Sequence, residues 1–189
     1  MASVGKGRRG WLKMTGTAAL LMAGLPVRSQ QGAATTDLSS IIVLDFDLLD
    51  DQDNPLTKAA QEVRLRNAGL QLQRELAERR LYRVADPAPA APLQRDLRLQ
   101  QENLFSCDDC ADQIGRKLGV DLVMQTWVQK VSELILNLNV QIYDVKAGKV
   151  IFTKSVDMRG NDDVSWMRAV RFLVRDMAEK RERNPKYGL

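Results

Sequence analysis

Two pairs of side chains in this sequence have the types and the spacing that chemistry requires: Asp45 with Asp47, and Cys107 with Cys110. The sequence contains no histidine. This absence removes the most common general base, the Ser-His-Asp triad and any zinc site with histidine ligands. Any catalysis would therefore depend on carboxylates or thiols.

The aspartate pair directly follows an apolar run, so both carboxylates would point to the same side of a strand end. This pattern resembles the first motif of haloacid-dehalogenase-type phosphatases, in which one aspartate attacks phosphorus and the second acts as acid and base. The segment 160–163 would then be the magnesium-binding acidic motif. However, Leu48 and Leu49 stand where that motif has glycine and threonine. We therefore interpret Asp45 and Asp47 as the start of a solvated acidic turn, with a magnesium-dependent phosphohydrolase as the alternative.

The cysteine pair lies at the expected start of a helix. A helix N-terminus stabilises thiolates, which would suit a redox pair, but Asp108 and Asp109 between the cysteines disfavour thiolate charge. A metal site would need two more ligands, and none has suitable spacing. We therefore predict a structural Cys107–Cys110 disulfide, contributing about 2 kcal/mol on the chain-entropy model. A thiol oxidoreductase is the alternative.

Residues 1–29 have the features of a cleavable export signal. A basic segment precedes the apolar run 14–27, which is too short to span a bilayer. Cleavage is expected at Ser29 or at Ala34. The segment 7–13 also resembles the twin-arginine export motif, and both export routes lead to the same compartment.

The charge balance changes once this signal is removed. Five of the 28 basic residues precede Gln30, which leaves 23 basic and 24 acidic residues and a formal charge of −1. With only a short basic tail at 180–186, no nucleic-acid partner is expected. No later apolar stretch reaches about 18 residues, so no membrane span is expected in the mature chain. We expect a soluble protein of the oxidising periplasm, or one secreted beyond it.

Periodicity and turn residues predict the secondary structure of the rest of the chain. The expected elements are a strand at 41–44, an acidic turn at 45–54, a helix at 57–80, a strand at 81–85, a loop at 86–92, a helical region at 93–118 broken near 105–106, strands at 122–131, 134–143 and 150–158, and a final helix beginning at 161–163. The order β-α-β-α-β-β-β-α predicts an α/β (α+β) fold with one mixed sheet and helices packed on it.

This pattern divides the mature chain into three parts. A flexible N-terminus at 30–40 precedes a single domain at 41–182, and a short tail follows at 183–189. Within the domain, Trp166 and the apolar stripe of the final helix are interpreted as core. Trp127 is interpreted in the same way. A partner-binding groove formed by these residues is the less favoured interpretation.

Three short segments resemble landmarks of a known envelope domain: 43–46 at its start, 118–121 before the third strand, and 143–150 at the hairpin. They are similar to the domain shared by the curli secretion protein CsgG, the N-terminal part of TolB and the penicillin-binding-protein activator LpoB. The stretch from Asn103 through Trp166 resembles an uncharacterised family of small secreted bacterial proteins more strongly. The resemblance implies protein interaction rather than catalysis. Because the chain has neither a lipidation cysteine nor obvious pore-forming segments, a channel role is not implied.

We therefore expect a non-catalytic accessory domain that binds another cell-envelope protein and needs no cofactor or metal. Docking would use an exposed sheet edge or face. The wet face of the 134–143 strand, with Asn137, Asn139 and Gln141, is one candidate surface. The identity of the partner and the oligomeric state are left open.

Overall fold

The computed structural model describes residues 38–50, 52 and 54–189. The predicted signal at 1–29, and the flexible segment as far as residue 37, lie outside the described residues. In chain order the elements are β1 (Ser40–Val43), β2 (Asp47–Asp50), α1 (Pro55–Glu78), β3 (Arg83–Val84), the 3₁₀ helix η1 (Ala88–Ala90), α2 (Ala91–Gln100), α3 (Cys110–Leu118), β4 (Leu122–Lys130), β5 (Ile135–Asp144), β6 (Lys149–Arg159) and α4 (Asp163–Arg183). Among the helices of this described part, none is long and apolar enough to cross a membrane.

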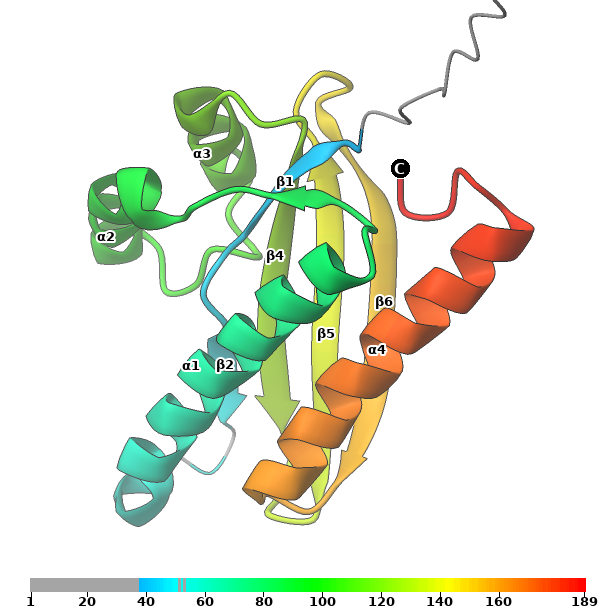
Figure 1. Ribbon diagram of the computed structural model, residues 1–189. Helices are drawn as coiled ribbons and strands as arrows, with labels where there is room; N and C mark the ends of the chain where they lie inside the picture. Colours follow the sequence, from blue (N-terminus) through cyan, green and yellow to red (C-terminus); the bar gives the residue numbers. More distant parts are fainter. Residues whose placement is uncertain (1–37, 51, 53) are drawn as a thin grey trace, which may run out of the picture. The chain divides into compact units, whose positions relative to one another are not determined.

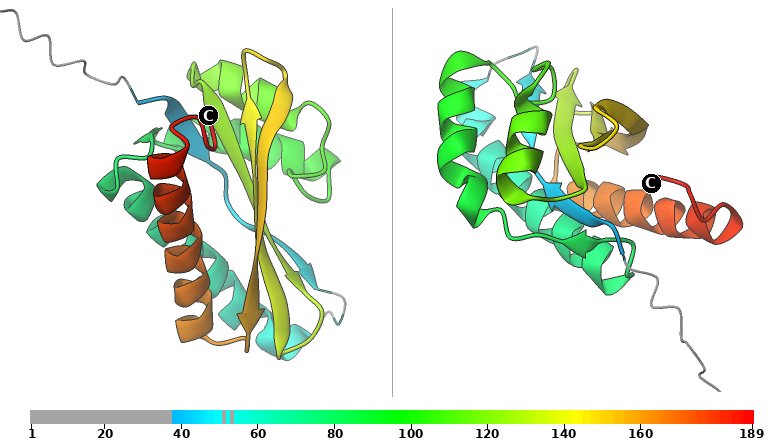
Figure 2. Two further views of the ribbon diagram at one scale, coloured as in Figure 1. Left: turned by 90° about the vertical axis from the view of Figure 1, so that its right-hand side faces the viewer. Right: turned by 90° about the horizontal axis from the view of Figure 1, so that it is seen from above.

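The six strands of the described residues belong to one sheet, in which β3, β1, β4, β5 and β6 follow one another and β2 pairs with β4 beyond the end of β1 (Figure 1). The pairs β1–β3, β1–β4 and β2–β4 are parallel, whereas β4–β5 and β5–β6 are antiparallel. Helices α1 and α4 cover one face, and α2 and α3 lie on the other face, as the view from above shows (Figure 2). The predicted α+β class with a mixed sheet is confirmed.

Strand β5 shows why the alternating pattern was a strong signal. Leu136, Leu138, Val140 and Ile142 are fully buried against α1 and α4, because every second side chain of a strand points to the same face. Leu134 was expected on the same buried face, but it precedes the strand and is 72% exposed.

The long helices begin at capping residues. Asn54 caps α1 by accepting a hydrogen bond from the Leu56 N–H at 3.0 Å, so the helix begins at Pro55, two residues before the expected start. Asp162 caps α4 through the Ser165 N–H at 2.8 Å. The α4 stripe faces the core as predicted: Trp166, Val170, Leu173, Val174 and Met177 are fully buried, and Met167 and Ala178 pack against them.

Two parts of the sequence expectation were wrong. The acidic turn at 45–54 contains β2, whose Leu48 and Leu49 lie opposite residues of β4. The proline-rich segment 86–92 is not simply a loop, because η1 and the first two residues of α2 lie in it. Proline is compatible with a first helical turn, where the backbone N–H has no intrahelical acceptor.

The sheet separates two apolar cores of different size. The cluster under α1 and α4 contains 24 buried residues, and the cluster under α2 and α3 contains 10. The chain after α4 turns back to the larger core, where Tyr187 packs and the Tyr82 hydroxyl donates to Gly188 C=O at 2.6 Å. The larger core therefore also holds the C-terminal residues.

Candidate functional site

Asp47 is the centre of a polar cluster where β2 meets the segment between α2 and α3. Its side chain is almost fully buried and forms an ion pair with Arg98 of α2. Its other carboxylate oxygen accepts a hydrogen bond from the Leu104 N–H at 2.8 Å. Both oxygens of Asp47 are thus engaged by groups of the protein itself, so the second aspartate of the pair has no free oxygen for acid–base catalysis.

Asp45 and the 160–163 segment do not complete a phosphatase site. The Asp45 side chain is exposed, and its backbone C=O accepts a hydrogen bond from Arg98 at 3.2 Å. In the 160–163 segment, Asp162 caps α4 and Asp163 pairs with Arg64 of α1. This segment follows β6, which is separated from β2 by β4 and β5, a distance of roughly 14 Å at the usual strand spacing. The expected acidic motifs are therefore not brought together.

Two glutamines of the sheet hold the segment that follows α2. Gln125 of β4 donates to Leu104 C=O at 2.5 Å. Gln141 of β5 donates to Phe105 C=O and to the Gln125 side chain, both at 2.9 Å. The Phe105 ring stacks on Trp127, with ring centroids 4.3 Å apart. Gln141 thus fixes a neighbouring segment and is not a free member of the wet face, whereas Trp127 is half-buried under Phe105 and lies outside the main cores.

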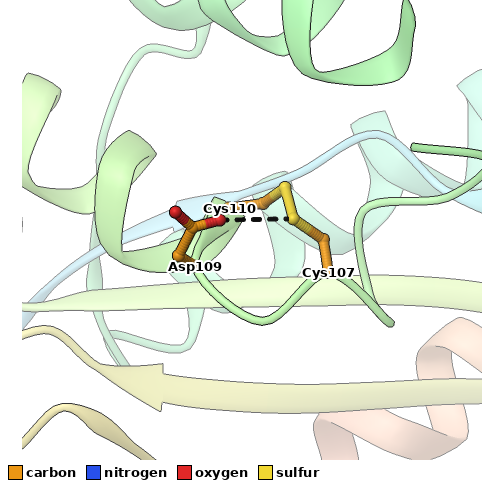
Figure 3. A group of neighbouring side chains, drawn as sticks. All are labelled: Cys107, Asp109 and Cys110. Carbon is orange, nitrogen blue, oxygen red and sulfur yellow. Dashed lines mark hydrogen bonds between the residues drawn. A yellow bond between two sulfur atoms is a disulfide. The ribbon is translucent and has the colours of Figure 1, made fainter. Parts of the chain in front are cut away.

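The two cysteine sulfurs are joined in the structure at the start of α3 (Figure 3). Cys110 is fully buried in the smaller core, and Cys107 packs at its margin. Asp109 Oδ1 lies 3.7 Å from Cys107 Sγ. Because a disulfide sulfur carries no proton, this approach is a contact between two acceptors and not a true hydrogen bond.

A metal could use this group only in the reduced protein. Cys107, Asp109 and Cys110 place three possible ligand atoms within 4.8 Å of one another. Zinc requires thiolates and a fourth ligand, and among the described residues no further cysteine, histidine or carboxylate joins the group. The arrangement fits a structural link between α3 and the segment before it better than it fits a metal centre.

Lys130 carries a buried charge that was not predicted from the sequence. Its Nζ lies 2.9 Å from Asp50 Oδ2 and 2.7 Å from Glu133 Oε1, and its side chain is fully buried. Burial lowers the pKa of Lys130, but the bonds to Glu133 and Asp50 outweigh this effect and raise the pKa above its usual value. The alternation of β4 could have predicted that Lys130 is buried, because Lys130 follows the inward positions Met124 and Val128 at even spacing.

Strand β6 is an outer strand of the sheet, and its free edge follows from the register. The Gly160 N–H donates to Leu134 C=O at 3.2 Å. These two residues continue the register of the Leu136–Met158 pair, two residues further along each chain segment. Hydrogen-bonded and non-bonded pairs alternate in an antiparallel ladder, so the even-numbered residues of β6 from Phe152 to Met158 bond to β5. The odd-numbered residues turn their backbone groups outward: Thr153, Ser155, Asp157 and Arg159. Among the described residues, one hydrogen bond reaches this row, from Ser165 Oγ to Arg159 C=O at 3.0 Å.

The wet face of β5 is the second open surface. Asn137 donates to Asp157 at 2.6 Å, and Asn139 donates to Asn137 C=O at 3.1 Å. Both side chains are half-buried. This face is therefore polar and largely paired within itself, which leaves the β6 edge as the surface with more unpaired backbone groups.

Comparisons with solved structures find similar chains at low sequence identity. The chain is similar to the LpoB C-terminal domain from Salmonella enterica, at a TM-score of 0.45 and 18% identity over 68% of this chain and 88% of that chain. It is similar to TolB from Acinetobacter baumannii, at 0.46 and 9% over 78% and 29%. It is also similar to the hypothetical protein CT253 from Chlamydia trachomatis, at 0.45 and 12% over 77% and 99%. Values this low do not identify a function.

A comparison with curated proteins gives no match. Residues 39–177 match the model of the family DUF3280, whose description is "Protein of unknown function (DUF2380)". This match confirms the resemblance to an uncharacterised family that the sequence landmarks indicated. Because the match covers more than half of the chain, from the residue before β1 into α4, the protein belongs to this family.

Proposed function

We propose that this protein is a non-catalytic domain that binds another protein of the cell envelope, and that it acts in the periplasm after removal of residues 1–29. The observation that carries the proposal is the outer edge of β6. A long strand with unpaired backbone groups is a ready template for pairing with another chain. A catalytic role has less support, because Asp47 is fully engaged by Arg98 and Leu104.

Photocrosslinking in living cells tests this proposal. A photoreactive amino acid is placed at one of three exposed or half-buried positions on different surfaces: Thr153 on β6, Asn137 on β5 or Leu99 on α2. The expected result is a discrete covalent product with the same envelope protein from at least one position, and none without irradiation. If all three positions give no product above the control, the binding role is wrong, and magnesium-phosphatase and insulin-reduction assays become the next tests.

A further inference from the structure

A groove runs along the free edge of β6. It has a volume of about 800 Å³ and lies between Ser155–Arg159 of β6 and the 165–175 stretch of α4. Figure 2 shows β6 and α4 side by side along this margin of the sheet. The outward row of Ser155, Asp157 and Arg159 backbone groups opens onto it. The groove therefore offers both a strand edge and the side chains of a neighbouring helix.

The side chains of this groove are strongly basic. Five arginines line it, against the single carboxylate of Asp157: Arg79, Arg159, Arg168, Arg171 and Arg175. No carboxylate of the described chain forms a salt bridge with Arg159, Arg168 or Arg171, and the partner of Arg175 is Glu179 at 3.8 Å. These arginines are exposed, and Arg159, Arg168 and Arg171 have no salt-bridge partner among the described residues.

An apolar side chain lies among the arginines. Phe172 is 43% exposed, and the Arg175 guanidinium lies 5.6 Å from the centre of its ring. Positions 168, 171, 172 and 175 share one face of α4, because residues three and four apart are neighbours on a helix. The helix therefore presents a stripe that pairs positive charge with a small apolar contact.

We propose that this groove binds an acidic segment of a partner protein in extended conformation, which adds to β6 as a further strand. The inference rests on the proposed protein-binding function and names its site and the chemistry of its ligand. The partner backbone would pair with the outward groups of Ser155 and Asp157. Alternate side chains of the added strand would point toward α4, where glutamates or aspartates would meet Arg168, Arg171 and Arg175.

The spacing of the two elements is compatible with this pairing. Side chains on one face of a strand recur about every 6.8 Å, and four helical residues rise about 6 Å. Acidic residues at every second position would thus follow the Arg171–Arg175 interval. Because the arginines are exposed, the interaction should also weaken as salt increases.

Peptide binding to the purified protein tests the proposal. The probe is a short fluorescent peptide that alternates glutamate with valine, and the control peptide has glutamine in place of glutamate. We expect saturable binding of the acidic peptide only. The variant Arg168→Glu/Arg171→Glu should weaken this binding by at least about tenfold, because two attractive contacts become repulsive. The matched control Arg95→Glu/Lys117→Glu makes the same charge change on exposed positions of α2 and α3 and should bind normally.

A second variant tests the strand edge separately. Ser155→Pro removes an outward N–H without removing a bond to β5, and proline is tolerated on edge strands. It should also weaken peptide binding by about tenfold. Circular dichroism shows whether Ser155→Pro folds. If it does not, the Arg168→Glu/Arg171→Glu variant alone decides the test.

Each remaining outcome overturns the inference. Equal loss in both charge variants would mean a general electrostatic effect, and unchanged binding by a folded Ser155→Pro would exclude strand addition. Stronger binding to anionic phospholipid vesicles than to the peptide would point to a membrane surface. A concentration-dependent mass that depends on Arg168 and Arg171 would assign the groove to a second copy of the chain. In all these cases, crosslinking from Asn137 or Leu99 would still support the proposed binding function.

Discussion

A buried carboxylate persists in a fold when its charge is paired and its oxygens accept hydrogen bonds. Asp47 meets both conditions through Arg98 and Leu104, whereas Asp45, two residues earlier, is exposed. Sequence spacing alone makes the two aspartates look equivalent. Their different surroundings lead to different expectations for the same substitution.

Asp47→Asn should lower the free energy of unfolding by about 2 kcal/mol, because Arg98 loses its charged partner and one hydrogen bond is weakened. Asp45→Asn removes the same charge from an exposed position and should change stability by less than about 0.5 kcal/mol. Urea unfolding of the two variants measures this difference. Equal effects would mean that the Asp47 cluster does not hold the segment after α2.

Asp121 gives a prediction for acid stability. The Ser40 hydroxyl and N–H donate to its carboxylate at 2.6 and 2.7 Å and hold the pKa of Asp121 below its usual value of 3.8. A lowered pKa in the folded state adds stability above pH 3.8, and this stability is lost as the pH falls through the folded value. Asp121→Asn should therefore be less stable than the wild type at pH 7, by about 1 kcal/mol, with a difference that shrinks below pH 3.8.

Unfolding curves at several pH values measure this difference. Comparison with the wild type at each pH removes the contribution of other acidic groups with lowered pKa, such as Asp50 and Glu133. Ser40→Ala serves as the matched control and should show the same pH trend. A difference that does not change with pH would contradict the role of the Asp121 charge.

At the scale of elements, the segment from Phe105 to α3 is fixed by three separate contacts: the Phe105–Trp127 stack, the Gln141 hydrogen bond and the Cys107–Cys110 link. The link closes a very short loop, so it should contribute about 2 kcal/mol on the chain-entropy model. Cys107→Ser should accordingly lower the melting temperature by several degrees and leave partner binding at β6 intact. Melting curves and the crosslinking yield from Thr153 measure the two effects. Loss of function at unchanged stability would instead indicate redox chemistry.

The sequence was most informative where one local rule determined the element. The β5 alternation, the α4 stripe and Gly119, which ends α3 at a φ of 64°, were all predictable because burial periodicity or a left-handed turn selects the residue type. β2 was not predictable, since its four residues form a strand only through pairing with β4. The same limit applies to Asp47, whose partner Arg98 is 51 residues away in the chain. The arginine groove could not be predicted from the sequence, because it forms only when the fold places β6 and α4 next to each other.

At the scale of the whole molecule, the sheet separates two apolar cores of unequal size, and the two sides of the domain should therefore differ in local stability. The larger core joins α1, α4 and the C-terminal residues to the long strands β4, β5 and β6. The smaller core under α2 and α3 has fewer than half as many buried residues and includes Cys110 of the disulfide. Because local opening requires the least free energy where the fewest apolar contacts are broken, α2 and α3 should open before the rest.

This inequality predicts a selective response to reduction. Treatment with dithiothreitol should speed amide hydrogen exchange in 88–118, whereas α1, α4 and β5 should keep their protection, because the larger core contains no disulfide. Hydrogen-exchange mass spectrometry at pH 7 measures both regions in one experiment. The oxidised protein and a Cys107→Ser/Cys110→Ser variant without dithiothreitol are the controls, and the variant should reproduce the reduced pattern. A uniform rise across all peptides would show that the two cores unfold as one unit, and the disulfide would then stabilise the whole domain.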